Sequence, residues 1–563
     1  MKLNKMTFAA LALAVTSLTS CIEEIDPQSN TVTVDQAGSA PNSFNKFVSA
    51  ITSDLNGRPM MFAEKNLSSK NFDFGYPSQM LQRDLMGQDI VYPAGGPAPG
   101  WFTVWYNYFD VLTPQYMACQ IPWTVYFAWI KNCNTVIKMG GANPTDTQKS
   151  GMGIAYAMRA FFYEDMAQMY ANETYTKNPQ AETIPLVTED ESVDMYHNPR
   201  ATNEKMWNFI LSDLDKAEQY LAGYERPDKT TPDVSVVYGL KARAYLVMGN
   251  WEKAEYYAKE AQKGYSVMSS DEYTSRETGF NTPNEAWMFC VTYKATDPCI
   301  KSNEADTSWG SQMSLEINPD KSVHLGYASC YGDAKEIDRH LYETIPATDC
   351  RKKCYVDFST NNMTGDELEN KLSEYTDYPS WLEYSASMAK WPGTGGLSLK
   401  FRTAGGVEGH NNPEKGFLQS VPLMRVEEMK LIEAEAAGMQ DEARGKQLLE
   451  AFAKTRDPQY VYGKHVNDKY GNSNTGFQNE IWWQRRVELW GEGFATFDIK
   501  RFGKSVIRSY AGTNHCEESR WNTNGVPQWM TLMIVESEGA YNSDCTQNPM
   551  VTTPTSDSPE YVW

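Results

Sequence analysis

Residues 237–261, VYGLKARAYLVMGNWEKAEYYAKEA, decide the fold that the sequence predicts. Apolar side chains recur in both halves at intervals of three and four residues: Val237, Leu240, Ala244 and Val247, then Trp251, Ala254, Ala258 and Ala261. This spacing is typical of amphipathic helices, because it places the apolar side chains on one face of each helix. The stretch therefore predicts two helices joined by a turn that is too short for anything but antiparallel packing.

The ends of both predicted helices are marked by residues that cap helices. Thr231 and Pro232 predict an N-cap and a first-turn proline for the first helix. Gly249 predicts a left-handed residue at its end, and Asn250 predicts the N-cap of the second helix. Alanines and tyrosines at these spacings are typical of a tetratricopeptide repeat. Since one such hairpin cannot bury its own apolar face, we expect an all-α scaffold of neighbouring hairpins.

The rest of the chain alternates helical patterns with two irregular regions. Helical character begins near Ser43, and further helices are predicted at about 114–139, 147–170, 202–221, 423–438, 441–454 and 477–502. Residues 71–112 and 269–419 are instead rich in Gly, Pro, Asn and Asp. Irregular segments of that length are usually functional. We therefore expect these irregular segments to make a ligand face, while the length of the chain alone allows either one large domain or two or three smaller ones.

The N-terminus has the pattern of a bacterial lipoprotein signal. Lys2 and Lys5 precede an apolar run that is too short to span a bilayer, and the small residues LTS lead directly into Cys21. We expect residues 1–20 to be removed and the Cys21 thiol to carry a lipid anchor. Residues 21–41 are polar and predict a flexible tether. The acidic pair after Cys21 resembles the signal that sends such lipoproteins to the outer face of the outer membrane.

Composition excludes some partners and favours others. The net charge of −21 argues against binding to the phosphate backbone of nucleic acids and against docking on an anionic membrane surface. Aromatic residues make up 13% of the chain, with 16 Trp and 33 Tyr, which is more than a core of this size needs. Part of these rings should therefore be exposed, where they could bind flat ligands.

Sugars suit such rings, because the apolar C–H face of a pyranose packs flat on an indole or phenol while polar neighbours bond its hydroxyls. Any single ring is still more often a core residue than a ligand contact. The candidate ligand contacts come from the two irregular regions and are Arg83, Asp84, Asp89, Tyr92, Trp101, Trp105, Trp287, Trp309, Tyr331, Trp381 and Trp391.

Motifs of catalysis and of metal binding are missing from the sequence. There is no GxSxG, HExxH, GxxxxGK[ST] or GxGxxG, and the cysteines and histidines have no ligand spacing, so we expect no metal and no cofactor. A glycosidase needs two carboxylates at a fixed separation across a cleft. The candidate acids all lie close in sequence to arginines, which favours ion pairs over catalysis: Glu427, Glu428, Glu488, Glu492 and Asp498. We therefore expect a binding protein and not an enzyme.

Several motifs together resemble the SusD/RagB family of outer-membrane nutrient-binding lipoproteins. In chain order these are AMRAFFY at 157–163 with IPL at 184–186, LKARAYL at 240–246 with GNW at 249–251, RVEE at 425–428 with AEA at 434–436, NEI at 479–481 through QRRVEL at 484–489, GEG at 491–493 and DIKR at 498–501, and QNP at 547–549. The family commonly has IPxxE before its final Asn-Pro, whereas this chain has LMIVE at 532–536.

The resemblance implies a fold, a ligand class and a partner. It implies that residues 42–563 form a single domain, in which four tetratricopeptide-like hairpins carry a ligand face of irregular segments. It also implies a partner, a TonB-dependent, SusC-like outer-membrane barrel over which the lipoprotein sits. The expected function is capture of oligosaccharides at the cell exterior and their delivery to that barrel. A peptide-binding receptor of the same family is one alternative, and a glycoside hydrolase is another.

Overall fold

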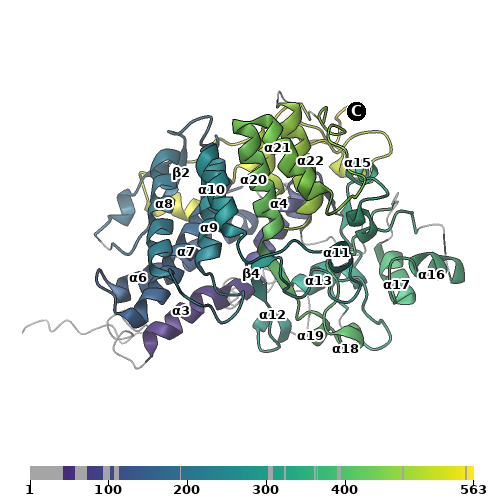
Figure 1. Ribbon diagram of the computed structural model, residues 1–563, viewed down its shortest axis with the longest axis horizontal. Coiled ribbons are helices and arrows are strands. Elements are labelled where there is room, and N and C mark those ends of the chain that lie inside the picture. The colour runs from purple at the N-terminus through teal and green to yellow at the C-terminus, as the bar shows by residue number, and fades with distance from the viewer. Residues whose placement is uncertain are drawn as a thin grey trace, which may run out of the picture. The chain divides into compact units, whose positions relative to one another are not determined.

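Long helices make up most of the regular structure in this computed structural model. The longer helices are α3 (Ser43–Ser53), α4 (Tyr76–Leu85), α6 (Met117–Gly140), α7 (Asp146–Tyr170), α8 (Asn203–Tyr220), α9 (Val234–Val247), α10 (Trp251–Ala261), α17 (Pro379–Ala389), α20 (Val426–Gln440), α21 (Glu442–Ala453), α22 (Gly476–Glu488) and α23 (Ala495–Phe502). Successive helices α6 to α10 pack on their neighbours, and α20 packs on both α10 and α21 (Figure 1). The expected all-α scaffold is confirmed.

The structure describes residues 42–57, 73–92, 102–106, 113–190, 192–301, 308–322, 325–360, 363, 365–389, 395–468, 470–471, 474–551 and 554–563. Within the chain, residues 44–563 form one unit. None of the helices in the described part is long and apolar enough to cross a membrane.

The hairpin at 237–261 has the predicted turn but a different first cap. Gly249 has a φ of 70°, and the Asn250 side chain accepts a hydrogen bond from the backbone N–H of Lys253, as expected. The N-cap of α9 is Asp233 and not Thr231, because its carboxylate lies next to the first helical residue and reaches the free N–H groups there. Ala254, in the middle of α10, is fully buried.

Two predicted helices differ in extent from the observed ones. The pattern at 477–502 breaks into α22 and α23, because Gly491 and Gly493 take left-handed backbone angles with φ of 76° and 87°. The helix expected from Leu423 begins three residues later, at Val426. Residues 420–425 are extended instead, since they form strand β6, which pairs with β4.

Short antiparallel strand pairs fasten distant segments to one another. They are β1 (Ile90–Val91) with β5 (Glu336–Ile337), β2 (Glu182–Pro185) with β3 (Arg200–Thr202), and β4 (Trp287–Thr292) with β6 (Ser420–Arg425). The β1–β5 pair joins the first irregular region to the second, and β4–β6 joins the second to the start of α20. The two irregular regions are therefore held on the helical scaffold by backbone hydrogen bonds.

The irregular regions and the tail contain short helices that periodicity did not predict. They are α5 (Thr103–Tyr106), α11 (Ser270–Tyr273), α12 (Pro298–Lys301), α13 (Trp309–Met313), α14 (Tyr327–Cys330), α15 (Arg339–Thr344), α16 (Asp366–Leu372), α18 (Gly406–Asn411), α19 (Pro413–Gly416) and α24 (Glu536–Tyr541). Short 3-10 helices lie at Asp54–Asn56, Met195–His197, Cys350–Cys354, Glu517–Ser519 and Gln528–Met530. Helices this short lack the repeat length that a periodic pattern needs.

Candidate ligand-binding surface

Aromatic side chains gather where α14 packs on α17. Tyr331 follows the last residue of α14, Tyr378 precedes the first residue of α17, and Trp381 and Tyr384 lie on α17 itself. Tyr331 is 42% exposed, and the other three rings are half-buried. We call these four residues the aromatic surface.

Helix α17 presents its rings outward because its opposite face is committed to packing. Leu382 and Ala386, four residues apart, are buried, and the Ser385 hydroxyl between them donates a 2.6 Å hydrogen bond to the Leu315 carbonyl. Side chains three or four residues apart share one side of a helix. Trp381 and Tyr384 therefore stand together on the side of α17 that is less covered.

Two rings of the aromatic surface lie flat against one another. The ring centroids of Tyr378 and Trp381 are 4.5 Å apart with an interplanar angle of 7°. Buried His410 supports Tyr378 from another side at 3.9 Å, and its Nδ1 contacts the backbone oxygen of Glu316 at 2.5 Å. The stack is thereby fixed in orientation, which lowers the entropy that a ligand would lose on ordering it.

A buried polar cluster adjoins the aromatic surface on the α14 side. The Tyr92 hydroxyl donates to Asp333 Oδ2 at 2.9 Å, and Lys335 Nζ donates to Gln312 Oε1 at 2.8 Å. The Asp333 N–H donates to the backbone oxygen of Tyr327, whose ring lies 5.0 Å from that of Tyr331. Burial raises the pKa of Asp333 and lowers the pKa of Lys335, because each charged form loses solvation. Tyr92, a predicted ligand contact, is fully buried, so in this structure it packs beneath the surface and offers no ring face to a ligand.

Arg83, Asp84 and Asp89 tie the first irregular region to the last motif helices instead of reaching the aromatic surface. Arg83 forms a 3.0 Å ion pair with Asp165, and Asp84 accepts hydrogen bonds from the backbone N–H groups of Gly493 and of Ala495, the first residue of α23. Asp89 forms an ion pair with Arg486 at 2.5 Å. Burial raises the pKa of Asp84 to about 7. All three are buried, so their expected role changes from ligand contact to positioning of the chain.

Three of the predicted tryptophans belong to the hydrophobic core. Trp105 is 1% exposed, and Trp287 and Trp309 are fully covered. Trp309 packs edge-on against Phe401 with centroids 5.0 Å apart, and Trp287 lies in strand β4. A ring with no free face cannot stack on a sugar, so these three serve packing in this structure. Trp101, Trp391 and Cys21 lie outside the described residues.

Of the predicted site residues, Tyr331 is exposed at the end of α14 and Trp381 is half-buried on α17, and these two helices pack on one another. Sequence reasoning missed Tyr378 and His410. The signal for Tyr378 was its spacing of three residues from Trp381 at the start of a short helix. His410 carried no such signal, because α18 reaches Tyr378 only through the tertiary fold.

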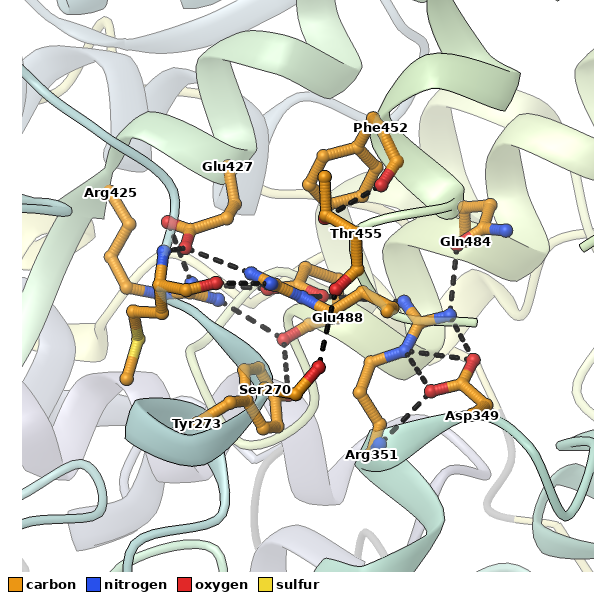
Figure 2. Close-up of polar contacts among 12 residues, drawn as sticks. Ser270, Tyr273, Asp349, Arg351, Arg425, Glu427, Phe452, Thr455, Gln484 and Glu488 are labelled. Atoms are coloured by element: carbon orange, nitrogen blue, oxygen red, sulfur yellow. Dashed lines mark hydrogen bonds and ion pairs between the residues drawn. The ribbon is translucent and has the colours of Figure 1, made fainter. Parts of the chain in front are cut away.

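The acidic residues of the motif helices form a buried ion network. Glu488 contacts Arg456 at 3.0 Å, Arg425 at 3.1 Å and Arg351 at 3.3 Å (Figure 2). Glu427 contacts Arg425 and Arg456, each at 2.9 Å. We call these five residues the ion network. Although burial opposes ionisation, the three guanidinium groups hold the pKa of Glu488 far below its usual range.

The remaining acids that could have served catalysis are ion-paired as well. Glu492 contacts Lys400 at 2.7 Å and Arg425 at 2.8 Å. Glu428 contacts Arg243 at 2.6 Å, and Asp498 contacts Arg485 at 2.7 Å. The expected ion pairs are confirmed for all five acids. Within the described part of the chain, no three His, Cys, Asp or Glu side chains are grouped to hold a metal ion.

Solved structures share this fold over most of its length. A SusD-like carbohydrate-binding protein from Bacteroides vulgatus has a TM-score of 0.65 and 21% identity, covering 90% of this chain and 97% of that one. Surface glycan-binding protein A from Bacteroides thetaiotaomicron, solved in complex with laminarihexaose, has a TM-score of 0.63 and 17% identity, covering 90% and 99%.

Sequence comparison points the same way. A SusD-like protein from Formosa agariphila is 22% identical over 430 residues, which is 70% of this chain and 74% of that protein. A family model described as starch-binding and associating with the outer membrane matches residues 100–246. The SusD family model matches residues 187–558, which is more than half of the chain. The chain therefore belongs to the SusD family.

Proposed function

We propose that this protein captures oligosaccharides at the cell surface and delivers them to a TonB-dependent outer-membrane barrel. The observation that carries the proposal is the aromatic surface, where Trp381 and Tyr378 stack at α17 and Tyr331 is exposed at the end of α14, which packs on α17. An aromatic ring held in one orientation with an uncovered face suits the flat C–H face of a sugar unit.

Membership of the SusD family supports a carbohydrate-binding role and association with the outer membrane. The relative that was solved with laminarihexaose shows that the same fold can hold an oligosaccharide.

Isothermal titration calorimetry of the purified protein against a panel of oligosaccharides tests the ligand class. We expect binding of at least one glycan, and loss of that binding when Tyr331 and Trp381 are both replaced by Ala. Replacing the exposed Tyr256 of α10 by Ala is the matched control, since that ring lies outside the aromatic surface. A protein that binds peptides from a parallel panel, and no glycan, would be a peptide receptor and the proposal would be wrong.

We further propose that the protein binds its ligand without cleaving it. Each of the five acids on the motif helices is engaged with an arginine or lysine, which leaves none of them poised as a general acid. Reducing-sugar release from the glycan that binds best should stay at the level of a blank. Sustained release at a rate proportional to protein concentration would contradict this part.

The N-terminal signal supports a lipid anchor, and membership of the family supports a transporter partner. Cys21 would carry the lipid and hold the protein on the exterior face of the outer membrane. Intact-mass analysis of the membrane-extracted protein should show the added lipid, and Cys21→Ser should release the protein from the membrane fraction. Affinity purification of the tagged protein from detergent-solubilised membranes should recover a TonB-dependent barrel.

A further inference from the structure

A cavity inside the helical scaffold shares no lining residue with the aromatic surface. It has a volume of about 40 Å³ and lies between helices α4, α7, α9, α20, α22 and α23 and the segment that joins the last two. A buried water needs about 10–15 Å³ of such space, so the cavity has room for about three water molecules. Arg243 and Phe494, which are half-buried, form part of its opening.

Charged side chains line this cavity, and nearly all of them are paired. The Arg83 guanidinium and the Tyr76 hydroxyl both donate to Asp165. Arg243 pairs with Glu428 at 2.6 Å.

The pairing continues on the side of α22 and α23. Asp498 contacts both Arg485, at 2.7 Å, and Arg501, at 3.0 Å. Glu492 is engaged by Arg425 at 2.8 Å and by Lys400 at 2.7 Å. Every arginine that lines the cavity thus has an acidic partner, and every acid named so far has a cationic one.

Glu164 of α7 is the exception. It is 3% exposed, its Oε1 has no hydrogen-bond partner, and it forms no ion pair within the described residues. Arg485, which also lines this cavity, has an Nη1 atom without a hydrogen-bond partner. An occupant must therefore accept a hydrogen bond from Arg485 and offer one to Glu164. Water does both, whereas a bare cation would face the positive charge of Arg485.

We propose that the cavity is an internal hydration site, in which about three water molecules bridge Glu164 and Arg485 and Glu164 holds a proton while the protein is folded. Unpaired buried carboxylates are costly, and protonation removes that cost. Burial accordingly raises the pKa of Glu164 well above its usual range. Asp165 and Glu428 add to this effect, and Arg243 opposes it.

This arrangement determines how the stability of the folded protein changes with pH. Below about pH 4.5 Glu164 is protonated in both the folded and the unfolded chain, so it contributes nothing to the pH dependence. As the pH rises, the unfolded chain releases this proton while the folded protein keeps it. The folded state loses stability relative to the unfolded state until the pH passes the folded pKa.

Thermal unfolding of Glu164→Gln against the unchanged protein at pH 5, 6, 7 and 8 tests the proposal. Because Gln has the same shape and carries no charge, the variant should have the higher Tm, and its advantage should grow by about 1 °C per pH unit. Glu428→Gln is the matched control, since Glu428 has a partner. Its Tm should be lower than that of the unchanged protein at every pH, because Arg243 loses its acid.

Two other measurements distinguish water next to a protonated Glu164 from other occupants of the cavity. A crystal structure at high resolution should show waters within hydrogen-bond distance of Glu164 Oε1 and Arg485 Nη1. Raising KCl or NaCl at constant ionic strength, balanced with a bulky organic cation, should leave the Tm difference unchanged. A Tm difference that is flat with pH, or one that disappears with K⁺ or Na⁺, would overturn the proposal.

Discussion

The ion network and the aromatic surface both contain residues that were considered for a functional role from the sequence, yet their surroundings are opposite. In the ion network, Glu427 and Glu488 are fully buried and each contacts more than one arginine (Figure 2). In the aromatic surface, Tyr331 is 42% exposed, and the Trp381 ring stacks on another ring of the same surface. The difference teaches that a side chain whose every face has a partner holds the fold, whereas a ring with an exposed face is available to a ligand.

The largest expected effect comes from removing the central acid of the ion network. Glu488→Ala should lower the free energy of unfolding by about 3–5 kcal/mol, because it leaves three buried arginines without their common partner. Chemical denaturation monitored by tryptophan fluorescence measures this loss.

Asp146→Ala is the control for that experiment. Asp146 forms an exposed ion pair with Lys149 at the start of α7, and its removal should change stability by no measurable amount. If both variants were equally stable, the ion network would not hold the fold, and the contrast between the two regions would fail.

A similar loss of stability is expected from a core tryptophan that sequence reasoning assigned to the ligand. Trp309→Ala removes a fully buried ring that packs on Phe401, which should cost about 3–5 kcal/mol in the free energy of unfolding. Glycan affinity of the protein that remains folded should be unchanged in calorimetry. Lost affinity at full stability would instead place Trp309 at the ligand.

The helical scaffold could be predicted because its information is local. Apolar spacing, Gly249 and Asn250 defined the central hairpin, and the capping side chain of Asn250 is observed. The predictions were wrong where tertiary contacts determine the backbone conformation. Residues 420–425 are extended in the structure, although the predicted helix began among them, because β4 pairs with them. The Gly491 and Gly493 angles break one long amphipathic pattern into two helices.

The candidate site was harder to predict, because exposure is not local information. Trp309 and Trp381 occur in the same irregular region, yet one is fully buried and the other half-buried. Only the packing of α13 against Phe401, and of α17 through Leu382, separates them. The stacking of His410 on Tyr378 joins segments about thirty residues apart and left no pattern in the sequence.

A smaller effect is expected for binding at the aromatic surface. Replacing Tyr331 and Trp381 together by Ala should weaken glycan binding by roughly 1–3 kcal/mol, about 5-fold to 150-fold in Kd, because each ring contributes stacking area. The Tm should stay close to that of the unchanged protein, since neither ring is fully buried. A fall in Tm with unchanged affinity would mean that these rings stabilise the fold, as the ion network does, and do not contact the ligand.

The smallest expected effect is a change in the free energy of unfolding at low pH, and it tests whether the ion network depends on the charge of Glu488. Because the folded pKa of Glu488 is held below its unfolded value, its charge stabilises the fold above about pH 4.5, and this stabilisation is lost as the pH falls toward the folded pKa. Glu488→Gln never has that charge. The difference in unfolding free energy between the unchanged protein and this variant should therefore be constant from pH 8 to about pH 5 and then shrink by up to about 1.4 kcal/mol per pH unit. Denaturation curves at pH 7, 5, 4 and 3.5 measure it, and other carboxylates cancel because both proteins share them. A difference that stays constant down to pH 3.5 would mean that the variant is penalised for the shape of its amide side chain and not for the missing charge.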